Sequence, residues 1–417
     1  MDTKIIFSIV SLLFINFSLI QAQPAVFDIT KFGAAPNGKA DASKAIADAW
    51  KEACAAAGSS KILIPAGTFL AGIVNVTGPC KGAIEVEVQG TVQAPPELAG
   101  GDGWFNFITK GLVRDITSLN SKYFYVNVLG CEDFTFEGFK VSTPESSLNT
   151  DGIHIGRSKG VTISNAKIGT GDDCISIGDG TENLKITKVA CGPGHDISIG
   201  SLGKYENEDP VSGITVSDCT LTGTTNGVRI KTWPALFPNT ATNIHFQYIT
   251  MENVSNPIIV DQMYCPWNKC NKKEPSKVKI SDVSFKNIKG TSATALTVQL
   301  ICSSGIPCEK VELANIDLTY SGPEGPAKSE CIDVKLTIVG KIPEGCKRVM
   351  MQDASQFVES DPSEWDGTDT FSPVLPRVQS GGVGSKESSR NPEMSLEVNN
   401  EGREQGRVSG DSMREEM

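Results

Sequence analysis

Short segments that alternate apolar and polar residues recur through the middle of the chain, and this alternation is typical of strands with one buried face. One set of such segments begins at residues 161, 184, 214, 244, 278 and 311, and its members are Val161–Ile163, Leu184–Ile186, Ile214–Val216, Ile244–Phe246, Val278–Ile280 and Val311–Leu313. An interval of 23 to 34 residues without helical patterning predicts a solenoid in which each repeat is one coil. A β-sandwich, with strands of similar length, is the alternative.

A second set of segments keeps step with the first and favours the solenoid. It reads DGIHIG (151–156), DCISIG (173–178), HDISIG (195–200) and NGVRIK (226–231). Alignment of the apolar positions makes three groups equivalent: Asp151, Asp173, His195 and Asn226; His154, Ser176, Ser198 and Arg229; and Gly156, Gly178, Gly200 and Lys231. In a parallel β-helix such positions stack at about 4.8 Å per coil. We therefore expect an all-β fold, a parallel β-helix, with one ladder of polar residues on its surface.

The two ends of the chain differ from this pattern. Residues 1–22 contain Lys4 and then a largely apolar run that ends in small Ala22, which predicts a signal peptide and a secreted protein. Residues 23–352 are expected to form the solenoid domain. Residues 353–417 are rich in Ser, Glu, Gly, Asp and Asn, and we expect a disordered tail there.

A helix is predicted over Asp41 to Ala57, where Ala, Ile, Trp and Cys recur at helical spacing. Asp41 is the candidate N-cap. A short helix at this place would cap the open end of the solenoid, because terminal coils need shielding. Trp50 is then expected in the core.

Composition narrows the environment and the partners. The 417 residues include twelve cysteines, a number that fits an oxidising compartment, and close spacing suggests the pairs Cys265 with Cys270, Cys302 with Cys308, and Cys331 with Cys346. Asn75 and Asn253 begin glycosylation acceptor sequences. The net charge of −11 argues against nucleic-acid binding, and no stretch after the signal peptide is apolar for long enough to span a membrane.

Three carboxylates, Asp151, Asp172 and Asp173, fall within two neighbouring coils of the predicted ladder. Backbone hydrogen bonding or a Ca²⁺ site would explain one or two of them. Because Arg229 and Lys231 belong to the same ladder, we favour a catalytic site instead. Crowded carboxylates repel one another, so at least one should keep its proton to higher pH, as the acid of a glycosidase must. The two cations suit a carboxylate on the substrate, which indicates an acidic sugar polymer.

Four segments resemble the signature motifs of plant polygalacturonases, the pectin-cleaving glycoside hydrolases of family 28: NTDGIHIG (149–156), GTGDDCISIG (169–178), CGPGHDISIGSLG (191–203) and RIKTW (229–233). The resemblance implies a right-handed parallel β-helix. It also implies a secreted cell-wall enzyme that hydrolyses the α-1,4 bonds of polygalacturonate with inversion and without a metal or other cofactor. Neighbouring coils place Asp151 and Asp173 roughly 5 Å apart, a separation associated with retention. We follow the resemblance and expect inversion.

The resemblance assigns roles to individual residues. Asp172 would be the general acid, and Asp151 and Asp173 would hold and deprotonate the water. His195 would support the protonation state of the site and the contacts with the substrate. The residues implied in substrate binding are Asn149, Arg229, Lys231 and Tyr264. Cys174 and Cys191 would form a disulfide, whereas the pairing of Cys54, Cys80, Cys131 and Cys219 is left open.

Asp196 departs from the family pattern, because the third motif usually has glycine at this position. Its carboxylate would either raise the pKa of His195 or point to the opposite face of the strand. The tail after Cys346 is a second departure.

The mode of attack and two rival activities remain alternatives. The segment SLGKYENE (201–208) resembles the pollen-type exo-acting members, so we expect exo attack from the non-reducing end, with endo attack as the alternative. A Ca²⁺-dependent lyase on the same fold and an inactive pectin-binding wall protein are the rivals. We expect a monomer.

Overall fold

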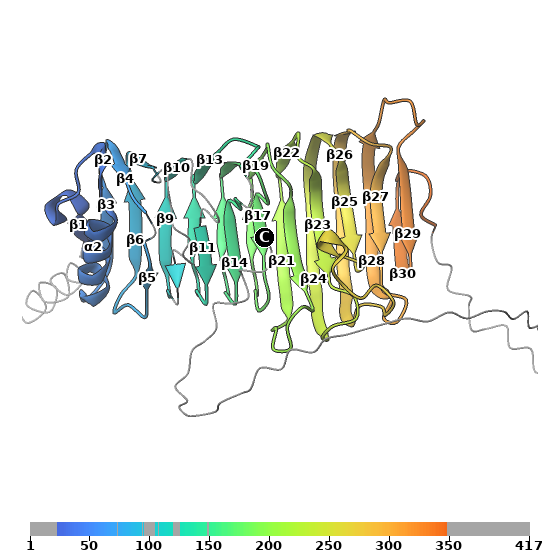
Figure 1. Cartoon of the computed structure of the whole chain (residues 1–417), viewed down its shortest axis with the longest axis horizontal. Coiled ribbons are helices and arrows are strands. Elements are labelled where there is room, and N and C mark those ends of the chain that lie inside the picture. Colours follow the sequence, from blue (N-terminus) through green and yellow to red (C-terminus); the bar gives the residue numbers. More distant parts are fainter. Residues whose placement is uncertain are drawn as a thin grey trace, which may run out of the picture. The chain divides into compact units, whose positions relative to one another are not determined.

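The computed structural model describes residues 23–347, apart from residues 73, 94, 96–104, 107, 120–125 and 148–149. The predicted signal peptide, the predicted C-terminal tail and Asn149 therefore lie outside the described residues. Within them, every pairing between strands is parallel, and the coils follow one another in chain order (Figure 1). No helix in this part of the chain is long and apolar enough to cross a bilayer.

The strands of successive coils form three rows. The first row contains β1 (Ala25–Asp28), β3 (Ser60–Ile64), β6 (Ile84–Val88), β9 (Gly111–Arg114), β12 (Thr135–Glu137), β15 (Thr162–Ser164), β18 (Lys185–Thr187) and β21 (Val211–Ser217). The second row contains β2 (Asn37–Asp41), β4 (Thr68–Leu70), β7 (Thr91–Gln93), β10 (Thr117–Leu119), β13 (Lys140–Ser142), β16 (Lys167–Gly169), β19 (Ala190–Cys191) and β22 (Thr220–Thr222). Both rows continue into the long strands β24 (Asn239–Val254), β26 (Val278–Ser292) and β28 (Cys308–Thr319), and β30 (Val334–Val339) ends the first.

The third row is a separate sheet of ten strands that carries the polar ladder. It contains β5 (Val76–Thr77), β8 (Phe105–Asn106), β11 (Val126–Leu129), β14 (Ile153–Gly156), β17 (Ile175–Ile177), β20 (Ile197–Leu202), β23 (Asn226–Thr232), β25 (Asn256–Asp261), β27 (Leu296–Ile301) and β29 (Lys328–Ile332). Ile153 pairs with Ile175, Ile175 with Ile197, and Ile197 with Val228, which confirms the predicted alignment of the second set of segments.

A residue in the left-handed conformation marks the bend between first-row and second-row strands in successive coils from β9 onward. These residues have φ between 54° and 65°, and they are Asp115, Gly138, Asn165, Lys188, Asp218, Tyr248, Asn287 and Asn315. Asparagine and aspartate tolerate this conformation better than other residues with a side chain, because their short polar groups bond to the local backbone. The Asn and Asp residues that interrupt the apolar alternation therefore set the corners of the coils.

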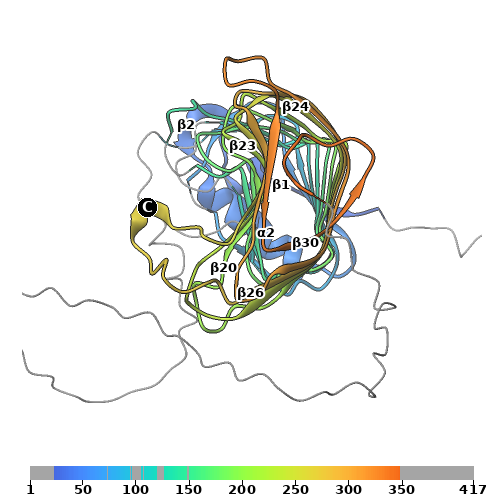
Figure 2. The same ribbon diagram turned by 90° about the vertical axis from the view of Figure 1, so that its right-hand side faces the viewer.

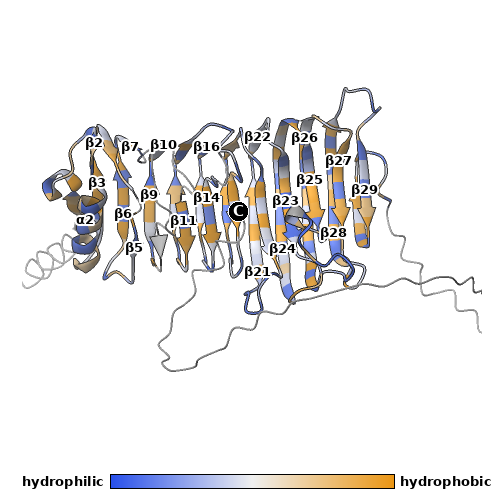
Figure 3. Ribbon diagram, in the orientation of Figure 1, coloured by the Kyte–Doolittle hydropathy of each residue, from blue (hydrophilic) through white to orange (hydrophobic). Residues whose placement is uncertain are grey.

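The alternation along the strands builds the core. The aligned inward positions of β14, β17, β20 and β23 are isoleucines and valines that are fully buried, and positions of opposite hydropathy follow one another along the strands (Figure 3). Phe246 and Phe285, on adjacent coils, stack with ring centroids 5.2 Å apart. Stacking of equivalent side chains on adjacent coils requires each coil to keep its register with the next.

One member of the first predicted set is assigned to the wrong register. Ile244 pairs with Val283, not with Val278, and Val283 pairs in turn with Val311. Val278 lies opposite Asn239, one bend earlier in the coil. The segment equivalent to the others is therefore Val283-Ser-Phe285, because the connection before β26 is longer than its counterparts.

The predicted capping helix is present as α2 (Ser43–Ala55), at the N-terminal end of the solenoid (Figures 1 and 2). Trp50 is buried, as expected, and its Nε1 donates to the Thr77 carbonyl at 3.1 Å. The prediction that Asp41 is the N-cap is wrong by one residue. Ala42 is the N-cap, while Asp41 is the last residue of β2 and accepts a hydrogen bond from Ser43 N at 2.8 Å. Two short 3₁₀ helices, η1 (Ile29–Phe32) and η2 (Pro266–Asn268), complete the described elements.

Candidate active site

The polar ladder begins where the chain enters β17 and β20. Asp172 lies in the bend between β16 and β17, before the strand alternation starts. Its backbone carbonyl accepts hydrogen bonds from Thr170 Oγ1 and from His195 N, both at 2.8 Å. These two bonds fix the bend against the next coil and hold Asp172 outside the strand.

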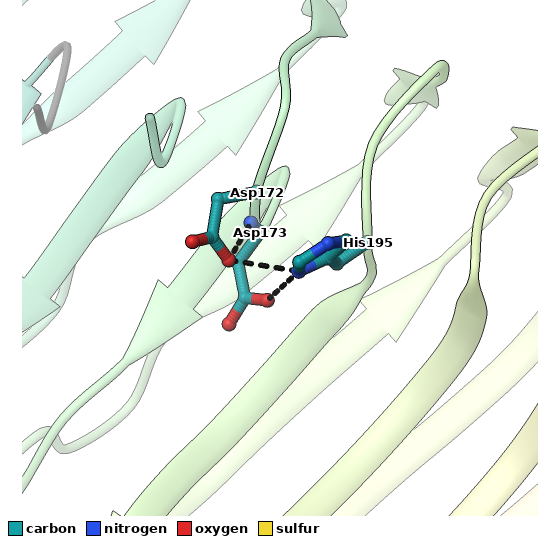
Figure 4. A group of neighbouring side chains, drawn as sticks. All are labelled: Asp172, Asp173 and His195. Carbon is teal, nitrogen blue, oxygen red and sulfur yellow. Dashed lines mark hydrogen bonds and ion pairs between the residues drawn. The ribbon is translucent and has the colours of Figure 1, made fainter. Parts of the chain in front are cut away.

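Asp172, Asp173 and His195 form the centre of the site (Figure 4). His195 Nδ1 lies 2.9 Å from Asp172 Oδ1 and 3.8 Å from Asp173 Oδ1. The hydrogen bond to Asp172 is the main reason that the pKa of His195 is raised, and the charges of Asp172 and Asp173 add to it against a burial effect. The Asp172 side chain is 23% exposed and that of Asp173 only 5%. Asp172 is thus the carboxylate of this pair that a ligand in solvent can reach.

Asp151 lies one coil earlier and is buried. Ser176 Oγ donates to Asp151 Oδ2 at 2.5 Å. Burial raises the pKa of Asp151 well above its usual value, and the charges of Asp173 and Asp172 act in the same direction. The sequence-based expectation that one crowded carboxylate keeps its proton is met here by Asp151.

Asp173 has the opposite environment, because it faces a cation. Lys231 Nζ lies 3.1 Å from Asp173 Oδ2, and Ser198 Oγ donates to the same oxygen at 2.5 Å. Burial alone would raise the pKa of Asp173, but Lys231 and hydrogen bonds from Asp196 and Ser198 bring it below the ordinary value. The same pairing raises the pKa of Lys231 despite its burial. Of the buried carboxyl groups Asp151 and Asp173, Asp173 is therefore the one that stays ionised.

The predicted substrate-binding cations meet at Tyr264. Arg229 Cζ lies 5.1 Å and Lys231 Nζ 5.5 Å from the centre of the Tyr264 ring, and Trp233 packs edge-on against that ring at 5.8 Å. Arg229 is also 3.7 Å from carboxylate oxygens of Asp196 and Asp261. The arrangement offers an anion a cationic patch on an aromatic wall.

Asp196 lies in the ladder, so the expectation that it points to the opposite face is wrong. The alternation rule does not apply, because Asp196 precedes the first residue of β20. Its carboxyl is fully buried and accepts from Asn226 Nδ2 at 3.0 Å. Burial and the adjacent charge of Asp173 raise the pKa of Asp196 to about 8.

A metal at this centre would have to compete with the existing pairs. Single ligand atoms of Asp172, Asp173 and His195 all lie within 4.8 Å of one another. However, Asp172 Oδ1 is engaged by His195 and by the Asp173 backbone N–H, and Asp173 Oδ2 by Lys231. A buried ammonium at 3.1 Å supplies the positive charge that a cation would otherwise bring, so the donor set fits an acid–base site better than a metal centre.

All four predicted disulfides are formed. Cys174 is bonded to Cys191, and the three close pairs are bonded as their spacing suggested. Of the cysteines left open, Cys54 is bonded to Cys80, while Cys131 and Cys219 are buried thiols. Because Cys174 follows Asp173 directly, its bond to Cys191 in β19 ties the bend that carries Asp172 and Asp173 to the next coil.

Removal of this disulfide tests that connection. The double replacement Cys174→Ala with Cys191→Ala is expected to lower the free energy of unfolding by about 3 kcal/mol, the loop-closure value for this 17-residue separation. It should also lower kcat by about 10- to 100-fold, because the bend loses its anchor. The control is the pair Cys302→Ala with Cys308→Ala, which lies beyond the end of β27 and should lose about 2 kcal/mol with kcat unchanged. Thermal unfolding and steady-state rates measure both; equal rates in the two variants would contradict the positioning role.

The two glycosylation acceptors are exposed: Asn75 precedes β5, and Asn253 lies near the end of β24.

Sequence reasoning missed Ser176 and Ser198, which donate to Asp151 and Asp173 from the next coil. The alignment made the two serines equivalent positions, but a serine on a strand face is usually solvated. Only the bend before each strand brings a carboxylate within reach of the serine on the next coil.

Comparisons with known proteins give a consistent result. Residues 103–341 match the family described as glycosyl hydrolases family 28. A polygalacturonase of Gossypium barbadense is 48% identical over 81% of this chain and 95% of its own length. An exopolygalacturonase of Oenothera organensis is 49% identical over 73% of this chain and 98% of its own length.

Solved structures share the fold at low sequence identity. The endo-xylogalacturonan hydrolase of Aspergillus tubingensis covers 77% of this chain and all of its own with a TM-score of 0.64 and 18% identity. An exopolygalacturonase of Thermotoga maritima covers 78% of this chain and 93% of its own with a TM-score of 0.59 and 16% identity. The fold is thus a right-handed parallel β-helix, as expected.

Proposed function

Because the chain belongs to the glycosyl hydrolases of family 28, we propose that it hydrolyses the α-1,4-galacturonosyl bonds of polygalacturonate, the backbone of pectin. One observation supports the proposal most directly. A single surface carries an ionised carboxylate, a more exposed carboxylate and a cationic patch next to one another. Asp173 and Asp172 supply the carboxylates, and Arg229 with Tyr264 supplies the patch. Such a surface matches a glycosidic bond flanked by uronate groups.

In this proposal Asp172 donates a proton to the leaving oxygen, since it is the more exposed carboxylate of the central pair. Asp173, kept ionised by Lys231, takes the proton of the attacking water. Asp151 orients that water, and His195 holds Asp172 through Nδ1. Water attacks the anomeric carbon from the face opposite the leaving oxygen, so the configuration inverts.

Arg229 binds the galacturonate carboxylate with its guanidinium, which Tyr264 supports from one side. Lys231 would bind the same galacturonate carboxylate, and its ammonium also neutralises Asp173. Asn149, the remaining predicted binding residue, is proposed on the motif alone.

Exo attack is supported by the relatives named exopolygalacturonase and by a braced loop beside the site. Glu208 accepts hydrogen bonds from the backbone N–H groups of residues 203, 204 and 205. Lys204 then lies 5.3 Å from the ring of Trp233, which packs on Tyr264. A rigid loop at this place would close one end of the binding surface.

Product analysis over time tests the activity and its mode together. Purified protein and polygalacturonate are expected to give galacturonate monomer from the first time point, without intermediate oligomers. Proton NMR of the first product should show the β anomer, because an α bond is cleaved with inversion. An oligomer ladder would contradict exo attack. A retained α anomer would contradict inversion, and an ultraviolet-absorbing product lost on chelation would indicate a lyase. Polymer binding without new reducing ends would indicate an inactive wall protein.

The place of action is proposed on the same basis. The relatives are plant polygalacturonases, and five disulfides in the described residues fit an oxidising compartment. We therefore propose secretion to the cell wall as a monomer, with glycans on Asn75 and Asn253.

A further inference from the structure

A fourth carboxyl group, that of Asp196, lies within the ladder and has no part in the proposed hydrolysis steps. It is fully buried, on the bend that leads into β20. The motif that this segment resembles has glycine at the position, so the family chemistry does not require a carboxyl group there. Burying one is costly unless it is neutral or fully paired.

The two oxygens of Asp196 have different surroundings. Oδ2 accepts from Asn226 Nδ2 at 3.0 Å and lies 3.7 Å from Arg229 Nη1. Oδ1 is buried, and no donor among the described residues reaches it. Because an ionised oxygen in such a place would lack any compensation, Oδ1 is the atom suited to carry a proton.

Asp173 accepts the hydrogen bond that this proton makes. Asp196 and Asp173 lie on neighbouring coils, where Cys174 N donates to the Asp196 carbonyl and Ser198 Oγ donates to Asp173 Oδ2. A side-chain hydrogen bond between the two carboxyl groups contributes to the pKa of each, and such a bond forms only when one of them holds a proton. Asp173 already accepts from Lys231 and Ser198, which favour its ionised form. The shared proton therefore belongs to Asp196.

The other charged groups around Asp196 do not reverse this assignment. On β23, Arg229 and Lys231 favour ionisation of Asp196, but Asp173 neutralises Lys231, and Asp261 at the end of β25 shares Arg229. His195, the preceding residue, is paired with Asp172. Tyr264 faces Arg229 and Lys231. Burial and the charge of Asp173 outweigh the two cations.

We propose that Asp196 is a positioning residue for the proposed hydrolysis: it keeps a proton on Oδ1 and donates a hydrogen bond to the Asp173 carboxylate, holding that base ionised and oriented. When Asp196 loses this proton at alkaline pH, the donor becomes a second negative charge beside the base. Asp196 thereby extends the activity of the enzyme to lower pH. It also adds its own ionisation to the alkaline side of the pH dependence of kcat/KM.

The test compares the pH dependence of kcat/KM for the native protein, Asp196→Asn and Asp196→Gly on polygalacturonate. Asparagine preserves a donor to Asp173 and an acceptor for Asn226, so its acidic limb should stay in place while the alkaline ionisation of Asp196 disappears. Glycine removes the donor, and its acidic limb should move up by about one pH unit, the effect of one hydrogen bond to a charged group. If the acidic side of the kcat/KM profile moves to lower pH in both variants, the proposal is wrong. Asp196 would then be a negative charge that raises the pKa of Asp173. Acidic limbs unchanged in both variants would overturn it as well.

A titration that does not depend on turnover separates this inference from the proposed function. Protein labelled with ¹³C at the aspartate side-chain carboxyls is titrated by NMR, and the signal missing from Asp196→Asn identifies Asp196. That signal should remain in its protonated form well above about pH 5, where ordinary aspartates are ionised. A protonated Asp196 in a protein that releases no sugar would support the hydrogen bond and contradict the hydrolase. An ionised Asp196 in an active enzyme would contradict the inference alone.

Discussion

Replacement of Asp172 by asparagine is expected to lower kcat by about 10²- to 10⁴-fold, the usual contribution of a general acid, with KM nearly unchanged. Asparagine keeps the size of the side chain and its acceptor for His195, but it cannot give a proton to the leaving oxygen. A loss confined to kcat indicates an interaction made only in the transition state. Initial rates over a range of substrate concentrations measure it.

Asp179→Asn is the matched control for this substitution. Asp179 follows the same strand, β17, and its side chain is 22% exposed, close to the 23% of Asp172. It pairs with Arg157 at 3.1 Å, a partially exposed pair of small energetic value. The control should retain nearly full kcat.

The contrary outcome has a defined meaning. If Asp172→Asn retains turnover while Asp151→Asn abolishes it, the acid is Asp151, whose pKa burial already raises. If both variants retain turnover, the proposed site is wrong. Only loss in Asp172→Asn with substrate binding preserved supports the assignment.

Sequence patterns predicted the parts of the fold that depend on periodicity. The register of Ile153, Ile175 and Ile197 followed from alternation, because a one-residue slip would turn every apolar side chain outward. The register near Val278 did not follow, since Val278-Lys-Ile280 and Val283-Ser-Phe285 carry the same pattern five residues apart. Only pairing with the neighbouring coils distinguishes these two.

Sequence patterns predicted which of the described ladder residues lie together and that one crowded carboxyl would keep its proton, but not the environment of Asp196. Stacking of equivalent positions brought Asp173, His195 and Lys231 together in the prediction, and the structure places them in contact. The position of Asp196 depends on a bend that no alternation rule describes. Its protonation depends on burial, which requires the packed coils.

Replacement of Lys231 by methionine is expected to destabilise the protein by about 3 to 5 kcal/mol at neutral pH, because it leaves the buried Asp173 charge without its partner. Both side chains are well buried, 11% and 5% exposed, so solvent compensates little. Methionine fills much of the same space, which confines the effect to charge. Activity should fall as well, since Asp173 would no longer stay ionised.

The pH dependence of this destabilisation follows from the pKa of Asp173, which Lys231 and two hydrogen bonds hold below its ordinary value of 3.8 against the effect of burial. In the native protein the group therefore contributes stability that is fully present above about pH 4 and lost as pH falls through the lower folded value. Without Lys231, burial raises the pKa of Asp173 instead. The unfolded chain then ionises first, so this contribution becomes a penalty at neutral pH that disappears on acidification. The difference in unfolding free energy between native and Lys231→Met protein should shrink from pH 7 towards pH 4.

Two further variants complete the measurement by denaturant unfolding. Lys286→Met removes a partially exposed ion pair with Glu312 between β26 and β28, and it should cost less than about 1 kcal/mol with little pH dependence. The double variant Lys231→Met with Asp173→Asn should recover most of the loss, because neither buried charge remains. A Lys231→Met penalty that is the same at pH 4 and pH 7, or that persists in the double variant, would show that Lys231 stabilises the ladder by packing and not as the counter-charge of Asp173.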